Sequence, residues 1–238
     1  MVFQDLFSWR RHRHLMLHTK AMLLMSAALI AGGFLVFLVV EFDNPNTLGA
    51  LPLFQKLNAA LFQSVSARTA GFASIDLSKM YDFSKVMMIF LMVIGAGSGS
   101  CAGGIKVTTF LVLMMTVVSV IRGRDDTVVL GRRVPKRTVY KSMTIAALGF
   151  AAVVMNAAVI LITLPNLSGV DGIFEAASAF GTVGMTAGVT MKFGIAAQIA
   201  TILTMFIGRL ADSFALALTI RGEGGGGEVL PEGKIMVG

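Results

Sequence analysis

Residues 21–40 read AMLLMSAALIAGGFLVFLVV and contain no charged side chain. About 20 consecutive apolar residues are enough for one helix to cross the hydrocarbon core of a bilayer. The whole chain fits this interpretation, because 55% of its 238 residues are hydrophobic and only 14% are charged. Globular proteins carry about 25% charged residues. The sequence therefore excludes a water-soluble globular enzyme and predicts a membrane protein.

Three further apolar stretches follow the first one. The second covers 83–121, which is too long for a single span, and its middle, 95–104, reads GAGSGSCAGG. Each Gly in a helix costs about 0.5–1 kcal/mol relative to Ala, so we expect this span to be broken. Broken backbone at membrane depth is tolerated only inside protein or beside a water-filled cavity. The third and fourth candidate spans cover 142–164 and 194–220.

The basic residues indicate how the spans are oriented. They gather before the first span and in the loop 122–141, and such an excess marks the cytoplasmic side of a membrane protein. We therefore expect the N-terminus (1–20), this loop and the tail (221–238) to be cytoplasmic. The two membrane units would then occupy 21–121 and 142–220. Membrane orientation also explains the net charge of +7, so no nucleic-acid partner is expected.

The chain offers no obvious metal or catalytic centre. Its one cysteine, Cys101, excludes a disulfide framework and a multi-cysteine metal site. Its three histidines, His12, His14 and His18, have no Cys or paired carboxylate nearby and are interpreted as a basic flank. The GAGSGS stretch lacks the strand–helix context of a nucleotide-binding motif. We expect no structural metal, no cofactor and no enzymatic activity.

The two segments predicted to lie on the outer side resemble each other. Residues 62–68, FQSVSAR, align with 174–180, FEAASAF. After one inserted residue, Gly181, the sequence Thr69-Ala70-Gly71-Phe72 aligns with Thr182-Val183-Gly184-Met185. Each copy has the order span, short helix, Thr-x-Gly turn, span. This order predicts a parallel internal repeat.

A Thr-x-Gly turn after a short re-entrant helix suits the dehydration of a cation. Glycine permits backbone angles that direct carbonyl oxygens into a pore. Rings of such oxygens replace the hydration shell of a potassium ion. The negative C-terminal end of the short helix would add a favourable field. One such segment alone could be an ordinary external turn, but the pair favours an ion filter.

Four ordered motifs resemble the Trk/Ktr/HKT superfamily of potassium transporters. They are QSVSARTAGFASIDLS (63–78), GSGSCAGGIKVTTF (97–110), FEAASAFGTVGMTAG (174–188) and PEGKIMVG (231–238). The last looks most like the bacterial Ktr type. Members of the superfamily carry four span–pore–span repeats around one pore. This chain resembles the third and fourth repeats, the C-terminal half of a translocating subunit.

The resemblance implies a set of site residues. The filter would consist of Thr69, Ala70, Gly71, Phe72, Thr182, Val183, Gly184 and Met185. The gate loop beneath it would contain Gly95, Gly97, Ser98, Gly99, Ser100, Cys101, Gly103 and Gly104. Arg209 matches a basic residue near the pore. Independently of the resemblance, a charge within a span costs about 2.5–3.5 kcal/mol or more, which predicts a functional role for Arg209. Asp212 is three residues further on and could pair with it.

Two departures from the family pattern stand out. Cys101 occupies a position where the family usually has Thr, and a thiol is the weaker hydrogen-bonding group. We expect the closed gate loop to be held less firmly as a result. After Arg209 the chain continues Leu210-Ala211-Asp212 instead of the usual Val-Gly-Pro, which leaves the register of that helix open.

The expected fold is an all-α integral membrane protein with four transmembrane helices, two re-entrant pore helices and one broken span. The resemblance implies multi-pass insertion in a bacterial plasma membrane (cell inner membrane) and uptake of K⁺, with Na⁺ as a candidate coupling ion. It also implies a homodimer that sits on a cytoplasmic nucleotide-binding regulatory ring.

Two filter segments do not close a four-sided pore. The chain shows no adaptation to a start at Met1, which favours a truncated transporter over a half-transporter that pairs with a second copy. The alternative is a non-conducting membrane fragment that binds a full-length transporter. A channel for neutral solutes is disfavoured, because only Asn44-Pro45-Asn46 approaches the paired Asn-Pro-Ala motif expected there. Ion selectivity, coupling mechanism, regulatory nucleotide and oligomeric state stay open at this stage.

Overall fold

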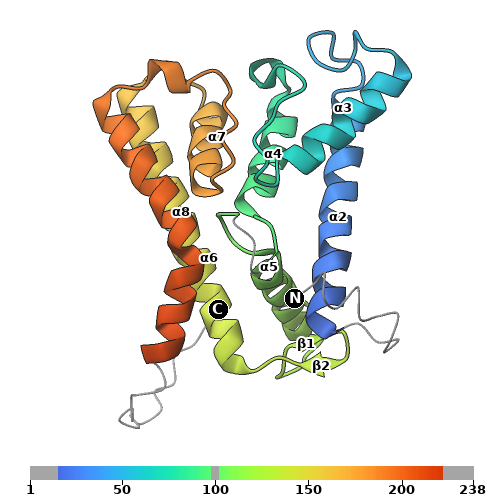
Figure 1. Cartoon of the computed structure of the whole chain (residues 1–238), viewed down its shortest axis with the longest axis vertical. Helices are drawn as coiled ribbons and strands as arrows, with labels where there is room; N and C mark the ends of the chain where they lie inside the picture. The colour runs from blue at the N-terminus through green and yellow to red at the C-terminus, as the bar shows by residue number, and fades with distance from the viewer. Residues whose placement is uncertain (1–15, 98–101, 222–238) are drawn as a thin grey trace.

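The computed structural model describes residues 16–97 and 102–221, with side chains described as far as residue 210. Long helices form the body of the molecule, and two short helices, α3 and α7, occupy the upper half of Figure 1. A small β-hairpin lies at the opposite end. The architecture is therefore helical, as expected from the sequence.

The helices fall into two units that follow one another in the chain. The first contains α2 (Leu17–Val40), α3 (Leu53–Ser66), the 3₁₀ turn η1 (Leu77–Lys79), α4 (Asp82–Val93) and α5 (Val107–Ile121). The second contains α6 (Lys136–Thr163), α7 (Gly169–Phe180), the 3₁₀ turn η2 (Thr190–Lys192) and α8 (Ile195–Arg221). Between them, β1 (Val128–Val129) and β2 (Arg132–Arg133) pair antiparallel. The sequence alone predicts only a loop for this hairpin segment.

Among the described residues, α2 and α6 are long and apolar enough to cross a membrane, by length and composition. Helix α5 and the segment Ile195–Leu210 of α8 are shorter apolar helices. Helix α2 begins four residues before the expected start at 21, and α6 begins at Lys136, inside the segment expected as loop 122–141. The apolar stretch 83–121 contains two helices, α4 and α5, and the described residues between them, 94–97 and 102–106, are not helical.

The interruption between α4 and α5 has its own hydrogen bonds. Ile94 and Ile105 form a parallel β-bridge. The Ile105 N–H donates to the Val93 carbonyl at 3.0 Å, and the Gly95 N–H donates to the Ile105 carbonyl at 2.9 Å. A Cβ atom at Gly95 would collide with the Gly103 carbonyl oxygen. Glycine at 95 therefore permits the two ends of the loop to pair closely, and the pairing satisfies buried backbone groups that would otherwise be costly.

The two units share one hydrophobic core. Helix α4 packs on α7, and α5 packs on α6. Fully buried side chains from both units, including Met88, Leu91, Phe174 and Phe180, belong to a single cluster. The Lys85 ammonium on α4 and the Asp171 carboxylate on α7 add a 2.7 Å ion pair across the same boundary. The first unit is thus anchored to the short helix of the second.

The two short helices differ in how much protein covers them. Eight of the 12 residues of α7 are buried, whereas four of the 14 residues of α3 are. The exposed apolar residues of α3 are Leu53, Phe54, Leu57, Leu61, Phe62 and Val65. An exposed apolar face of this kind marks a contact surface for protein or lipid. Helix α3 therefore lies at an open side of the described structure.

Candidate functional site

The two Thr-x-Gly turns have the same backbone conformation. Thr69 and Gly71 have φ values of 69° and 82°, and Thr182 and Gly184 have φ values of 51° and 89°. The residues between them, Ala70 and Val183, do not have positive φ. A left-handed conformation costs a non-glycine residue about 1–2 kcal/mol, so two threonines in it at matching positions are unlikely to be accidental. The sequence repeat is therefore also a conformational repeat.

One serine in each short helix fixes the turn that follows. The Ser66 hydroxyl donates to the Phe72 carbonyl at 2.5 Å, and the Ser178 hydroxyl donates to the Met185 carbonyl at 2.6 Å. Backbone bonds repeat as well: the Ala70 N–H donates to the Ser66 carbonyl, and the Val183 N–H to the Ser178 carbonyl. Each turn is therefore folded back onto the C-terminal end of its own helix by the same bonds.

The two turns meet in space. An added Cβ atom at Gly71 would collide with the carbonyl oxygen of Val183, so this oxygen lies directly against the first turn. At Gly184, by contrast, an added Cβ atom would meet nothing within 4 Å. Phe72 is 68% exposed, whereas its counterpart Met185 is 3% exposed. Gly71 thus lies against the second turn, whereas Gly184 faces open space.

The glycine-rich loop lies against the second turn. The Gly103 N–H donates to the Thr182 hydroxyl at 3.1 Å, and the Gly104 N–H donates to the Gly208 carbonyl of α8 at 3.3 Å. An added Cβ atom at Gly104 would be 3.4 Å from the Cα atom of Gly181. The structure thus brings Gly103 and Gly104 next to the second turn, whereas Gly95 lies against Gly103 and Gly97 lies against Met22 of α2. The expected gate residues Ser98, Gly99, Ser100 and Cys101 lie outside the described residues.

Arg209 is exposed and occupies the position after Gly208 on α8. The Gly208 carbonyl accepts the hydrogen bond from Gly104, so the backbone at Arg209 adjoins the glycine-rich loop. An added Cβ atom at Gly208 would collide with the Phe180 carbonyl oxygen, so α8 also approaches the end of α7 closely. The side chain of Asp212, the suggested partner of Arg209, lies outside the described part of the chain.

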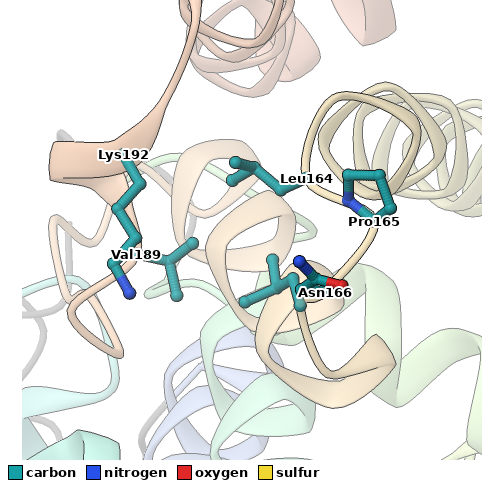
Figure 2. Close-up of a pocket in the computed structure, with 6 residues that line it drawn as sticks. Leu164, Pro165, Asn166, Val189 and Lys192 are labelled. Carbon is teal, nitrogen blue, oxygen red and sulfur yellow. The ribbon is translucent and has the colours of Figure 1, made fainter.

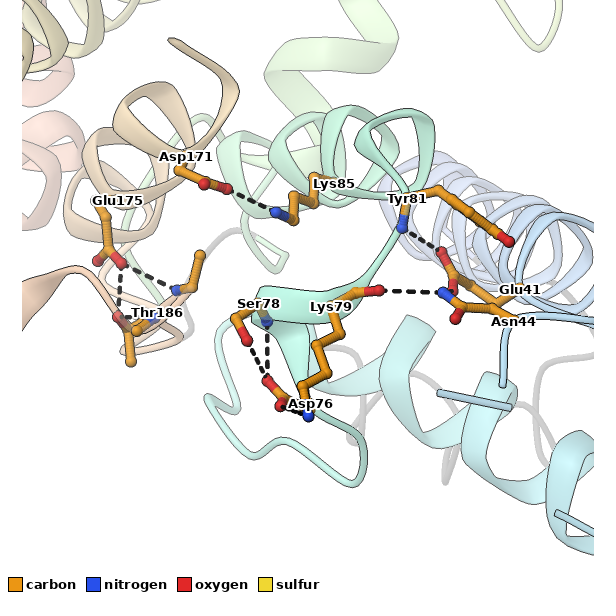
Figure 3. A network of polar contacts seen from close by, with 12 residues as sticks. Glu41, Asn44, Asp76, Ser78, Lys79, Tyr81, Lys85, Asp171, Glu175 and Thr186 are labelled. Atoms are coloured by element: carbon orange, nitrogen blue, oxygen red, sulfur yellow. Dashed lines mark hydrogen bonds and ion pairs between the residues drawn. The ribbon is translucent and has the colours of Figure 1, made fainter. Parts of the chain in front are cut away.

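A buried carboxylate that the sequence analysis did not select holds the segment after the second turn. Glu175 on α7 is 5% exposed. Its carboxylate accepts hydrogen bonds from the Thr186 hydroxyl at 2.5 Å, the Ala187 N–H at 2.9 Å and the Thr190 hydroxyl at 2.9 Å. Figure 3 shows Glu175 facing Thr186. The sequence repeat could have pointed to Glu175. The alignment that pairs Phe62 with Phe174 also pairs Gln63 with Glu175, so the two repeats differ in charge at this position.

Gln63 occupies the same place in the first repeat but makes different contacts. It is fully buried, and its Nε2 atom lies 3.9 Å from the Met88 sulfur and 3.7 Å from the Met185 sulfur. Its Oε1 atom is buried without a hydrogen-bond partner among the described residues. Gln63 therefore contacts the second turn through Met185, whereas Glu175 holds the segment of its own repeat.

A second polar network fixes the outer end of the first unit. The carboxylate of buried Glu41, just past α2, accepts from the Asn44 amide at 2.6 Å, the Thr47 hydroxyl at 2.6 Å and the Tyr81 N–H at 2.9 Å. The Asn44 amide also donates to the Lys79 carbonyl. As Figure 3 shows, this network ties the end of α2 to the start of α4.

The η1 turn adds a small exposed cluster in the same view. Ser78 donates to the Asp76 carboxylate from both its N–H and its hydroxyl, and the hydroxyl bond lowers the pKa of Asp76 most. The Lys79 Nζ atom lies 3.4 Å from the Oδ2 atom of the same carboxylate. These contacts stabilise the connection between the first turn and α4.

A pocket of about 160 Å³ lies away from the turns. It is lined by Leu164, Pro165, Asn166, Leu167, Val189 and Lys192, and none of the expected filter residues is among them. Figure 2 shows Lys192 and Val189 on one side and the α6–α7 connection on the other. Its walls are mainly apolar, which does not suit an ion. Within the described residues, no group of three or more His, Cys, Asp or Glu could hold a metal ion.

The described residues thus combine long apolar helices, a duplicated helix–turn unit and an interrupted helix between α4 and α5. The family model TrkH, described as a cation transport protein, matches residues 6–221. The chain therefore belongs to the TrkH family of cation transport proteins.

Individual relatives agree with the family assignment. The chain is 38% identical over 209 residues to the Ktr system potassium uptake protein B of Bacillus subtilis, covering 88% of this chain and 47% of that protein. It is 41% identical over 204 residues to the protein of the same name from Vibrio alginolyticus, covering 85% and 44%. The potassium/sodium uptake protein NtpJ of Enterococcus hirae is 35% identical over 213 residues, covering 88% and 47%.

A solved structure shows the same fold. The potassium transporter TrkH from Vibrio parahaemolyticus matches with a TM-score of 0.63 at 22% identity, covering 85% of this chain and 44% of that chain. The chain spans about half the length of the curated relatives it matches. These relatives are named as ion transport proteins, not as enzymes.

Proposed function

We propose that this chain supplies two sides of a membrane pore for potassium uptake, with Na⁺ as a candidate coupling ion. The two turns, 69–72 and 182–185, would dehydrate the ion with their backbone carbonyls. The observation that carries this proposal is the matched backbone of the turns: the same φ pattern, the same Ser-to-carbonyl bond and direct contact between them. Rigidly held carbonyl oxygens can replace the hydration shell of K⁺. The names of the relatives support potassium as the ion.

The short helices favour a cation at this place. Helices α3 and α7 each end two or three residues before a Thr-x-Gly turn begins its left-handed conformation. The C-terminal end of a helix carries the equivalent of about half a negative charge. Two such ends beside the turns lower the free energy of a dehydrated cation without any side-chain carboxylate.

The glycine-rich loop is proposed as the gate below the turns. Its described parts contact the second turn at Thr182 and helix α8 at Gly208. Backbone that is rich in glycine and otherwise carries only small side chains can change conformation at low steric cost. Arg209, beside Gly208, is proposed to act on the ion or the loop from α8.

The remaining sides of the pore must come from further repeats or from another copy of the chain. The exposed apolar face of α3 and the space at Gly184 support this, because both lie where a neighbouring unit would pack. We further propose that the complete transporter is a homodimer on a cytoplasmic nucleotide-binding regulatory ring. The basic loop 122–141 would face the cytoplasm together with both termini.

The test is potassium uptake in bacterial cells that lack their own uptake systems. The chain is expressed alone and together with a separate chain that carries the first two repeats of a relative, and Rb⁺ uptake is measured with and without Na⁺. Uptake by the chain alone means that copies of it complete the pore. Uptake only with the added repeats means that it forms half of a transporter. No uptake in either case, with the chain inserted, overturns the proposal in favour of a non-conducting membrane partner.

The filter assignment has a separate test. Gly71→Ser and Gly184→Ser each place a side chain on a residue with φ above 80°. Both variants should alter the preference for K⁺ over Na⁺ in the assembly that conducts. Ser74→Gly, a change outside the two turns at an exposed position, is the control. Transport with unaltered ion preference in both turn variants would remove the two turns from the filter.

A further inference from the structure

The side chain of Arg68 connects three segments of the first unit. Arg68 lies between Ala67, the C-cap residue of α3, and Thr69, which starts the first turn. Its Nη1 atom donates to the Ser26 carbonyl of α2 at 3.3 Å, and its Nη2 atom donates to the Ser26 hydroxyl at 3.4 Å. Nη2 also donates to the carbonyl of Gly95 at 3.4 Å. One guanidinium thus joins α2, the first turn and the start of the glycine-rich loop.

Placing a guanidinium at this position costs free energy, because the charged group loses part of its hydration. Arg68 is half-buried, and its Nε atom is buried with no hydrogen-bond partner among the described residues. The three hydrogen bonds above run to carbonyl and hydroxyl oxygens, not to a carboxylate. A partly buried ionised side chain without a carboxylate partner indicates a functional position, because desolvation of the charge is costly.

The second repeat indicates that folding of the turn does not need this charge. The residue aligned with Arg68 is Phe180, which is 1% exposed in the hydrophobic core. The turn after Phe180 has the same φ pattern and the same serine bond as the turn after Arg68. Arg68 therefore serves something that the first repeat has and the second lacks, and the loop that starts at Gly95 fits that description.

Gly95 is where the two ends of the glycine-rich loop contact each other. Its N–H donates to the Ile105 carbonyl, and its Cα lies against the Gly103 carbonyl oxygen. Residues from both ends of the loop thus meet at Gly95. The far end is held in turn by the Gly103 bond to Thr182. A constraint on the Gly95 carbonyl therefore acts on both described ends of the loop.

We propose that Arg68 is a positioning residue that holds the glycine-rich loop in place beneath the turns, and so sets how readily the loop opens. This inference rests on the proposed function of the loop as the gate. Arg68 acts through hydrogen bonds with fork geometry, which lysine cannot reproduce. Its removal frees the loop without changing the carbonyls that contact the ion.

The first experiment measures loop displacement without requiring transport. Cys101 is the only cysteine in the chain, and its position in the sequence falls within this loop. The full chain is reconstituted in lipid vesicles, and the rate of Cys101 modification by a charged methanethiosulfonate reagent is measured. Arg68→Met and Arg68→Lys should both raise the rate, by on the order of tenfold for the loss of hydrogen bonds to a charged group. Ser26→Ala should give a smaller rise, and Arg122→Met, at an exposed position, should give none.

The second experiment measures Rb⁺ uptake in whichever assembly conducts. The expected result for Arg68→Met is a higher maximal rate with an unchanged preference for K⁺ over Na⁺. A wild-type modification rate in both Arg68→Met and Arg68→Lys overturns the proposal. So does a wild-type rate in Arg68→Lys alone, because charge and not geometry would then be the cause. An altered ion preference would make Arg68 part of the filter and also overturn it.

The two readouts separate this inference from the proposed function. If no assembly transports Rb⁺ but Cys101 reacts faster in the Arg68 variants, the positioning role of Arg68 is supported and the transport proposal fails. If Arg68→Met does not reach the membrane, Arg68→Lys and Ser26→Ala decide: wild-type modification rates in both contradict the proposal.

Discussion

The backbone N–H of Gly103 donates a 3.1 Å hydrogen bond to the side-chain hydroxyl of Thr182. The bond joins two residues that the sequence analysis assigned to different parts, one to the gate loop and one to the filter. A threonine hydroxyl that accepts this bond has one lone pair fewer to offer to an ion. If the loop acts as the proposed gate, its movement would therefore also change the hydrogen bonding of the second turn.

Loss of the Thr182 hydroxyl should free the loop at this end. We expect Thr182→Val to lose about 0.5–1.5 kcal/mol of loop stabilisation, because one hydrogen bond disappears, and Thr182→Ser to keep most of it. Hydrogen exchange of the Gly103 amide measures the effect. Thr69→Val is the matched control in the first turn and should leave exchange at Gly103 unchanged. Equal exchange in all four proteins would show that the bond does not hold the loop.

The two turn glycines should respond differently to alanine in the chain alone. Both substitutions strain a positive φ, but only Gly71→Ala also collides with the Val183 carbonyl. Overpacking of this kind costs about 1–3 kcal/mol more, so Gly71→Ala should lower the unfolding temperature in detergent more than Gly184→Ala. When the other sides of the proposed pore are supplied by further repeats or a second copy, the difference in unfolding temperature between the two variants should shrink. A larger effect of Gly184→Ala in the isolated chain would contradict the packing described here.

Neutralising Glu175 should loosen the segment after the second turn. Its carboxylate accepts three hydrogen bonds, and Gln has only one accepting oxygen. We expect Glu175→Gln to cost about 1.5–3 kcal/mol, the range for a hydrogen bond to a charged group. Thermal unfolding measures the loss. Thr190→Val, which removes one of the three donors, should cost less than Glu175→Gln, and the reverse order would refute the assigned role.

The two members of the ion pair between α4 and α7 should contribute to the free energy of unfolding in a strongly non-additive way. Lys85 is 6% and Asp171 20% exposed at the side chain. Removing one partner of a buried pair costs about 3–5 kcal/mol, and Lys85→Met should fall at the lower end because Asp171 keeps some water. The double variant Lys85→Met/Asp171→Leu should recover most of the loss, since no uncompensated charge remains. Additive losses in a double-mutant cycle would mean that the pair does not couple the two units.

Much of the helical framework could be predicted from the sequence, because apolar length and glycine clusters are local signals. The stretch 21–40 lies within α2, and 95–104 lies within the interruption between α4 and α5. The hairpin at 128–133 escaped prediction because its strands have two residues each, too few for any alternating pattern. The contact of Gly71 with Val183 joins residues far apart in the chain, and no local signal encodes it.

The candidate site was predicted in part for the same reason. The Thr-x-Gly motifs are visible in the sequence, and their positive φ values follow from the turn they form. The roles of Ser66, Ser178 and Glu175 depend on which groups tertiary packing brings within hydrogen-bond distance, so the sequence alone did not select them. The four loop residues 98–101 lie outside the described residues, and their part in the gate stays a prediction.

Gln63 and Glu175 occupy equivalent places in the two repeats, yet one contacts methionine sulfurs and the other binds three donors. Two identical subunits could not differ in this way, because each change in the gene would appear in both copies. Joining the two repeats in one polypeptide removes that restriction. Each repeat can then acquire its own contacts by single substitutions, and a specialised element such as the glycine-rich loop needs to be present in only one of them.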